Sequence, residues 1–163
     1  MAGLAHLGVG FAMKWAAPKA PVAALVVGAE LLDLLCIPAM LARQSDVFIM
    51  VTTHGLAAAL IWSALAGGIA AVAKLDLRSS LAIGLAVFSH WLLDFITHPM
   101  GAIYGGKPAS PDLPLLGSLS PKVGLGLYNH SYALALTFDI GVTLLGIAAY
   151  VGFKVLERQR RAA

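Results

Sequence analysis

Five long apolar segments, joined by short polar connections, constrain the fold of this chain more than any other feature. Hydrophobic residues make up 60% of its 163 residues and charged residues only 12%, against about 25% charged in soluble domains. Four of the segments approach or exceed the ~20 residues that a helix needs to cross a bilayer. We therefore predict an all-α integral membrane protein, with a single domain over residues 1–163 and a bundle of four to five transmembrane helices. The expected helices cover residues 4–15, 20–41, 47–73, 81–98 and 127–153.

The connection over residues 99–126 differs from the others because it is long and holds five of the eight prolines. Such a segment cannot remain helical for long, so we expect an exposed loop that could cover a site.

Lysine and arginine residues indicate the orientation of the bundle, since they concentrate in cytoplasmic loops. If the C-terminus is cytoplasmic, five spans place eight basic residues inside and three outside. This count favours an N-out, C-in topology with the 99–126 loop outside. If the first segment is re-entrant, the N-terminus could instead be inside. The basic residues thus indicate topology, and nothing in the sequence suggests a nucleic-acid partner.

One apolar segment carries the run from Ser89 to His98, in which three polar residues recur at every fourth position: His90, Asp94 and His98. On a helix this spacing makes a single polar stripe. Ionisable groups at membrane depth are costly unless they are paired, hydrated or bound to a metal. Two imidazoles and one carboxylate suit a borderline metal, so the stripe points to a divalent ion, zinc in the first place and manganese in the second.

The predicted topology brings the other polar membrane residues to a similar depth in the outer leaflet. This co-location predicts one convergent site and leaves the inner half nearly free of ionisable groups. The expected metal ligands are His6, Asp33, His54, His90 and Asp94, and the expected catalytic residues are Glu30 and His98. Structural alternatives remain open for each: a helix-packing hydrogen bond for His90 with Asp94, a helix cap for His98, and an interfacial position for His6. The role of His130 stays open between the site and an interfacial position, and Asp139 receives no role.

The order of these motifs resembles the LexA-regulated, membrane-bound metal-dependent hydrolase family. The resemblance covers about residues 6–100 and rests on His6, Gly28 through Asp33, Thr53-His54, and Ser89-His90 through Asp94. It implies a helical membrane fold and a divalent metal held by these His and Asp residues, in the cell membrane of a prokaryote. That family is in turn distantly similar to all-helical zinc-dependent phospholipases C, which implies phosphoester hydrolysis.

Two motifs depart from the family pattern. The second-helix motif lacks a proline and a second acid, and Ile49, Met50 and Val51 stand where the family has His, Arg and Gly. The missing Arg removes a phosphate clamp.

Two functions fit these observations, and a third fits them less well. The first is a metal-dependent hydrolase acting on a lipid or lipid-linked phosphoester at the outer leaflet. The second is a non-catalytic accessory subunit that keeps the hydrolase scaffold within a larger membrane complex, with a structural metal or, ranked lower, a haem or pigment. The third, a small ion transporter, needs a polar path through both leaflets, which the apolar inner half does not supply.

Overall fold

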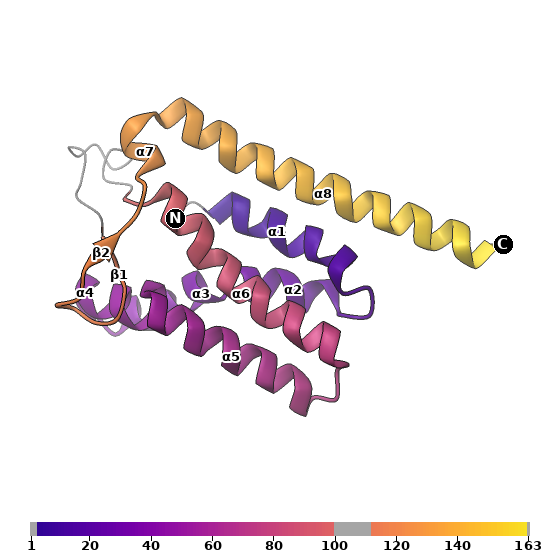
Figure 1. The fold of residues 1–163 in the computed structure, drawn as a ribbon, viewed down its shortest axis with the longest axis horizontal. Helices are drawn as coiled ribbons and strands as arrows, with labels where there is room; N and C mark the ends of the chain where they lie inside the picture. Colours follow the sequence, from indigo (N-terminus) through magenta and orange to yellow (C-terminus); the bar gives the residue numbers. More distant parts are fainter. Residues whose placement is uncertain (1–2, 100–111, 163) are drawn as a thin grey trace.

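The computed structural model describes residues 3–99 and 112–162, and 78% of these residues are helical (Figure 1). The helices are α1 (Gly3–Ala16), α2 (Val22–Ala29), α3 (Leu31–Leu41), α4 (Asp46–Ile49), the π-helix η1 (Met50–His54), α5 (Leu56–Val72), α6 (Leu77–Thr97), α7 (Leu127–His130) and α8 (Tyr132–Ala162). Two short strands, β1 (Leu113–Pro114) and β2 (Lys122–Val123), form an antiparallel pair. The predicted all-helical class is confirmed apart from this small hairpin.

Helix α6 is the centre of the bundle and packs against α1, α2 and α5. The apolar window of α6 is 61% buried, whereas that of α8 is only 17% buried. Helix α8 lies at the periphery, against α1, and extends beyond the rest of the molecule at its C-terminal end (Figure 1). Most of the apolar window of α6 therefore faces protein, whereas most of the apolar window of α8 lies on the surface of the bundle.

Two helices, α6 and α8, are long and apolar enough to cross a membrane, and two bent pairs could each supply one more span. The pairs are α2 with α3, bent by 57°, and Asp46–His54 with α5, bent by 50°. The structure thus supports two to four candidate spans among the described residues. With 14 residues, α1 is about 21 Å long at 1.5 Å per residue, too short to cross the ~30 Å hydrocarbon core alone.

The expected continuous helices 20–41 and 47–73 are wrong at one point each, because the structure breaks them at Glu30 and Gly55. At the first break, the side chain of His90 bonds the carbonyl of Ala29, the last residue of α2. At the second, Gly55 adopts an extended conformation (φ −65°, ψ 147°) after the π-turn. The hydroxyl of Thr53 bonds the Ile49 carbonyl one turn back, a contact that bends helices.

Close packing of glycines fixes α1 against α8. A Cβ atom added at Gly146 would overlap the Gly8 carbonyl oxygen, so the two helices could not approach this closely with a larger residue there. The Thr143 hydroxyl also donates to the Leu4 carbonyl at 2.5 Å. These contacts hold the first turns of α1 beside the polar half of α6.

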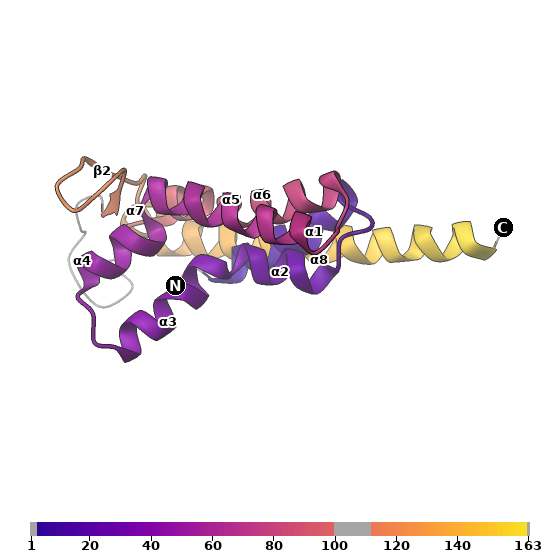
Figure 2. The ribbon, with the colours of Figure 1, turned by 90° about the horizontal axis from the view of Figure 1, so that it is seen from below.

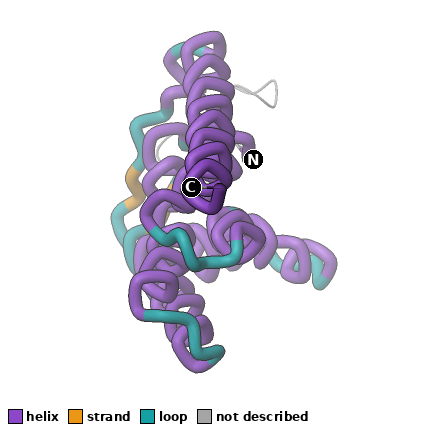
Figure 3. The backbone as a smooth tube through the Cα atoms, turned by 90° about the vertical axis from the view of Figure 1, so that its right-hand side faces the viewer, coloured by secondary structure: helices purple, strands orange, loops and turns teal. Residues whose placement is uncertain are grey.

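The basic end of the molecule holds the α1–α2 and α5–α6 connections and the C-terminal part of α8, and Figure 3 shows it facing the viewer. Arg78 at the start of α6 bonds the Ala16 carbonyl at the end of α1. Asp76 caps α6, and the hydrogen bonds from the Ser79 hydroxyl and N–H lower the pKa of its carboxyl below the ordinary value. The basic residues grouped by the topology argument therefore do share one end.

The hairpin lies at the opposite end, beside α4 and η1 (Figure 1). The Ala57 N–H donates to the Leu115 carbonyl at 3.0 Å, and the Gly126 N–H donates to the His98 carbonyl at 2.7 Å. Gly124, at φ 147°, leaves no room for a side chain, since a Cβ there would overlap the His98 carbonyl oxygen. The described part of the 99–126 segment therefore packs onto the end of the bundle that holds the polar cluster; residues 100–111 of the expected loop lie outside the described residues.

Candidate metal centre

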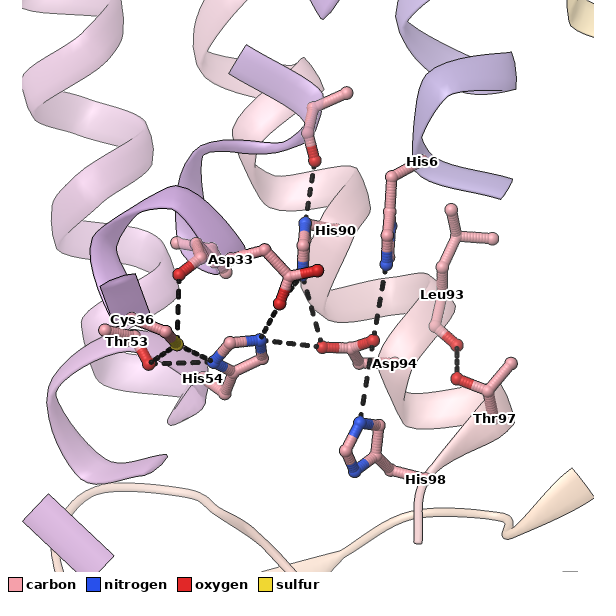
Figure 4. A network of polar contacts seen from close by, with 12 residues as sticks. His6, Asp33, Cys36, Thr53, His54, His90, Leu93, Asp94, Thr97 and His98 are labelled. Carbon is pink, nitrogen blue, oxygen red and sulfur yellow. Dashed lines mark hydrogen bonds and ion pairs between the residues drawn. The ribbon is translucent and has the colours of Figure 1, made fainter. Parts of the chain in front are cut away.

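The carboxylate of Asp94 is the hub of a buried cluster of imidazoles (Figure 4). Its side chain is 3% exposed, and its oxygens lie 3.5 Å from His6 Nε2, 3.3 Å from His54 Nε2 and 3.4 Å from His90 Nε2. His98 Nε2 is farther away, at 3.9 Å. The predicted convergence of α1, η1 and α6 on one point is therefore present, and it occurs around a single carboxylate.

The two helix breaks supply the other half of the cluster. Asp33 lies in the first turn of α3, directly after the break at Glu30, and His54 is the last residue of the π-turn. Asp33 Oδ1 lies 3.3 Å from His54 Nε2 and 3.8 Å from His90 Nε2. Short π-helical turns are often found at functional sites because they redirect one side chain out of the regular helix.

The tautomers of His54 and His90 are fixed by neighbours on the outside of the cluster. His90 Nδ1 donates to the Ala29 carbonyl at 2.7 Å. His54 Nδ1 lies 2.8 Å from the Thr53 hydroxyl, which itself donates to the Ile49 carbonyl and so accepts from the imidazole. With the proton on Nδ1, each neutral ring presents the lone pair of Nε2 to the interior.

In the neutral form of each ring this lone pair faces carboxylate oxygens, which are also acceptors, at 3.3–3.4 Å. His90 Nε2 and Asp94 Oδ2 are both buried without a hydrogen-bond partner among the described residues. Buried acceptors that face one another are costly unless a proton or a cation lies between them. The imidazoles and carboxylates could therefore ligate a cation or share protons. The hydrogen bonds of Nδ1 on the outside are of the kind that orients metal-binding imidazoles.

His6 completes the cluster from α1. Its ring stacks on that of His90 with centroids 3.6 Å apart and planes inclined by 2°. Protonating both rings would place two positive charges at this short distance, which Coulomb repulsion opposes. Both nitrogens of His6 are buried without a hydrogen-bond partner in the described part of the chain. Neutral rings around a shared cation avoid this repulsion.

The spacing of the donor atoms can be compared with the dimensions of a zinc site. Two ligands at 2.0–2.2 Å from a tetrahedral ion lie about 3.4 Å apart, and three of the His–Asp separations are 3.3–3.4 Å. Three sets of described residues each bring one ligand atom per residue within 4.8 Å of one another: His6–Asp33–His90, Asp33–Cys36–His54 and His54–His90–Asp94. The residues present could hold a metal ion, and the buried third set is the best candidate core.

The two expected catalytic residues lie at the edge of the cluster and belong to none of these three sets. Glu30, at the helix break, is partly buried, and its Oε1 has no hydrogen-bond partner among the described residues. His98 follows the last turn of α6, and its Nδ1 lies 3.2 Å and 3.3 Å from the two carboxylate oxygens of Asp112. Both side chains border the site without occupying its centre.

Sequence reasoning missed several contacts of the site. The sequence pattern does not indicate the contact of Asp112 with His98, which only the folded segment brings about. Cys36 is a second such residue: its Sγ lies 3.4 Å from the Thr53 hydroxyl and 3.7 Å from His54 Nδ1. The i, i+3 spacing of Asp33 and Cys36 was the available signal.

Asp139 and His130 lie outside the cluster. Asp139 accepts a hydrogen bond from the Tyr128 hydroxyl, and His130 is exposed on α7.

Access to the cluster is through Asp33, whose side chain is 27% exposed while those of His6, His54, His90 and Asp94 are at most 6% exposed. After the break at Glu30, α3 diverges from α5 and α6 (Figure 2). The bend thus opens one flank of an otherwise enclosed centre.

Comparison of the chain with protein-family models, with curated proteins and with solved structures finds no match. The family resemblance drawn from the motifs therefore stays a prediction.

Proposed function

We propose that this chain is a membrane-embedded, metal-dependent hydrolase that cleaves a phosphoester of a lipid or lipid-linked substrate. The observation that carries the proposal is the inward arrangement of acceptors: His54 and His90, with their protons held outside, face the carboxylates of Asp33 and Asp94. Such a set can hold a divalent cation between its imidazoles and carboxylates. The metal ligands are Asp33, His54, His90 and Asp94, with His6 at the side of His90.

A divalent ion held there would polarise a phosphoryl oxygen and lower the pKa of a nearby water. Glu30 accepts a proton from the attacking water while the oxygen of that water forms its bond to phosphorus. His98, held by Asp112, gives a proton to the leaving oxygen as the ester P–O bond breaks. Both residues suit these roles because they border the cluster and remain free of its ligand sets.

A lipid substrate is supported by an apolar groove on the flank of the cluster. The groove has a volume of about 410 Å³ and runs between α2 and α5, past Gly28, Leu31 and Trp62. Two of these residues bracket Glu30, and the indole of Trp62 donates to the Thr52 carbonyl at 2.9 Å, beside His54. A lipid whose acyl chain lies in this groove would have its polar headgroup at the open side of the site.

The test compares metal content with activity in the purified chain. Wild type is expected to carry a divalent metal and to release phosphate or a phosphorylated headgroup from phospholipid or polyprenyl phosphate vesicles. Glu30→Gln and His98→Gln should retain the metal and lose most of the turnover, whereas His90→Ala should lose both. A folded wild type that holds no divalent metal would overturn the hydrolase and favour the accessory-subunit alternative.

The chain is further proposed to lie in the cell membrane of a prokaryote with the basic end in the cytoplasm. The shared end of the Lys and Arg residues supports this orientation. The cluster then lies toward the outer leaflet, in reach of lipid headgroups on that side.

A further inference from the structure

A second cavity lies at the basic end of the molecule, remote from the His and Asp cluster. It has a volume of about 550 Å³ and lies between the end of α1 with the following turn and the last turns of α8. Figure 1 shows this end, where α8 passes the α1–α2 connection. One wall is apolar and is formed by Trp15, Phe153 and Leu156.

The apolar wall is held in place by specific contacts. The Trp15 indole donates to the Ala149 carbonyl at 2.6 Å and meets the Phe153 ring edge-on, with centroids 5.8 Å apart. The Lys14 ammonium donates to the Ala20 carbonyl at 2.6 Å and lies 5.6 Å from the centre of the Phe153 ring. The cavity is therefore a shaped feature between two helices, with an aromatic side that suits the membrane interface.

The opposite side of the cavity is cationic and is formed by Lys19, Arg160 and Arg161. The single carboxylate in the lining, Glu157, is already engaged by Lys154 at 2.5 Å and by Arg161 at 2.8 Å. No ion pair of Lys19 or Arg160 is found within residues 3–99 and 112–162. Two cations thus remain to receive an anion.

The depth of the cavity follows from the length of α8. Its 31 residues extend about 46 Å at 1.5 Å per residue, which exceeds the ~30 Å hydrocarbon core by roughly ten residues. Because the basic residues cluster after Phe153, these extra turns lie at the headgroup level.

We propose that this cavity is a binding site for an anionic phospholipid of the leaflet at the basic end. The phosphodiester lies between Lys19 and Arg160, and the glycerol and upper acyl carbons lie against the wall of Trp15, Phe153 and Leu156. An amphipathic cavity with an apolar wall and a cationic rim matches a phospholipid better than it matches a free anion. This site is separate from the metal centre, and its occupancy does not depend on the hydrolase activity.

The experiment measures retention of phosphatidylglycerol and phosphatidylcholine by the full chain in mild detergent, using native mass spectrometry over a range of lipid concentrations. The double variant Lys19→Gln/Arg160→Gln is compared with the charge-matched Lys74→Gln/Arg158→Gln, whose positions lie at the same end but outside the cavity. A contact of the bound phosphodiester with each rim cation, Lys19 and Arg160, is expected to contribute about fivefold to binding, and the control variant keeps both contacts. The cavity variant should therefore bind phosphatidylglycerol about thirtyfold more weakly, and the control should bind it as wild type does.

Equal losses in both double variants would mean that the basic end attracts anionic lipid without a defined site, which overturns the proposal. An unchanged cavity variant would overturn it as well. Inorganic phosphate and glycerol phosphate are added in competition: if either displaces the lipid at millimolar concentration, the site recognises a free phosphate instead. Melting temperatures equal to that of wild type show that both variants remain folded.

Discussion

The substitution Asp94→Asn tests the metal centre because it keeps the size of the side chain and removes the negative charge at the hub. The carboxylate lies 3.3–3.5 Å from three imidazoles, so its loss should weaken metal binding by more than the 10–100-fold typical of an outer-shell contact. At a zinc concentration 100 times its dissociation constant, wild type gains about 2.7 kcal/mol of stability. A variant that binds about 100-fold more weakly gains about 0.4 kcal/mol, a difference of about 2 kcal/mol.

For a chain of this length, that difference corresponds to a loss of about 5–9 °C in the zinc-dependent rise of the melting temperature. The assay is thermal unfolding in detergent, followed by circular dichroism, with zinc and with excess chelator. In excess chelator the variant should no longer be less stable than wild type. The amide that replaces the carboxylate can donate a hydrogen bond to an imidazole, so the variant should be as stable as wild type or more stable. Asp139→Asn is the control, since this buried acid on α8 contacts Tyr128 and belongs to none of the ligand sets. Equal zinc responses of wild type and Asp94→Asn would refute the reasoning.

Three further predictions address the support of the site, the packing and the topology. Thr53→Val should weaken zinc affinity about 10–100-fold by freeing His54, measured by competition with a chromophoric chelator, while the neighbouring Thr52→Val should not; equal affinities for both variants would remove Thr53 from the site. Gly146→Ala should lower the free energy of unfolding by about 1–3 kcal/mol through overpacking against α1. The control Gly141→Ala places its methyl group in open space, so it should leave the free energy of unfolding unchanged or raise it by up to about 1 kcal/mol. Similar denaturation curves for the two variants would contradict the glycine contact. In a Cys36→Ala background, Ser118→Cys should react with an impermeant maleimide from outside intact cells and Lys74→Cys should not, and the reverse pattern would invert the proposed orientation.

The stripe on α6 was predictable because it depends only on helical spacing. His90 and Asp94 are one turn apart in any α-helix, and an apolar surrounding segment makes such a pair conspicuous. The approach of Asp33 and His54 followed less directly, from their similar depth in the expected topology. Depth alone gave no distances, and it could not separate the central His54 from His98 at the edge.

The helix breaks could not be predicted, because the segments 20–41 and 47–73 are apolar through most of their length and carry no proline at either break. The bend at Glu30 accompanies the contact of the Ala29 carbonyl with His90, 61 residues away. The bend at Gly55 accompanies the hydrogen bond between Ala57 and Leu115 of the hairpin segment. Both contacts join segments that are distant in sequence, so the local composition could not predict them. Asp112 was missed for the same reason, since only the folded hairpin segment places it beside His98.

The breaks and the cluster explain each other physically. An interrupted helix leaves backbone groups unpaired, which is tolerated at membrane depth only where protein or a polar cavity receives them. Here the Ala29 carbonyl accepts a hydrogen bond from His90. The turn before Gly55 is stabilised by the hydroxyl of Thr53, which also accepts a hydrogen bond from His54 and so orients its ring. The polar residues therefore need the breaks to converge, and the breaks need polar partners to be stable. A continuous helix at either position would lose one side of the centre, which is why the ionisable groups gather at these bends and the rest of the bundle remains apolar.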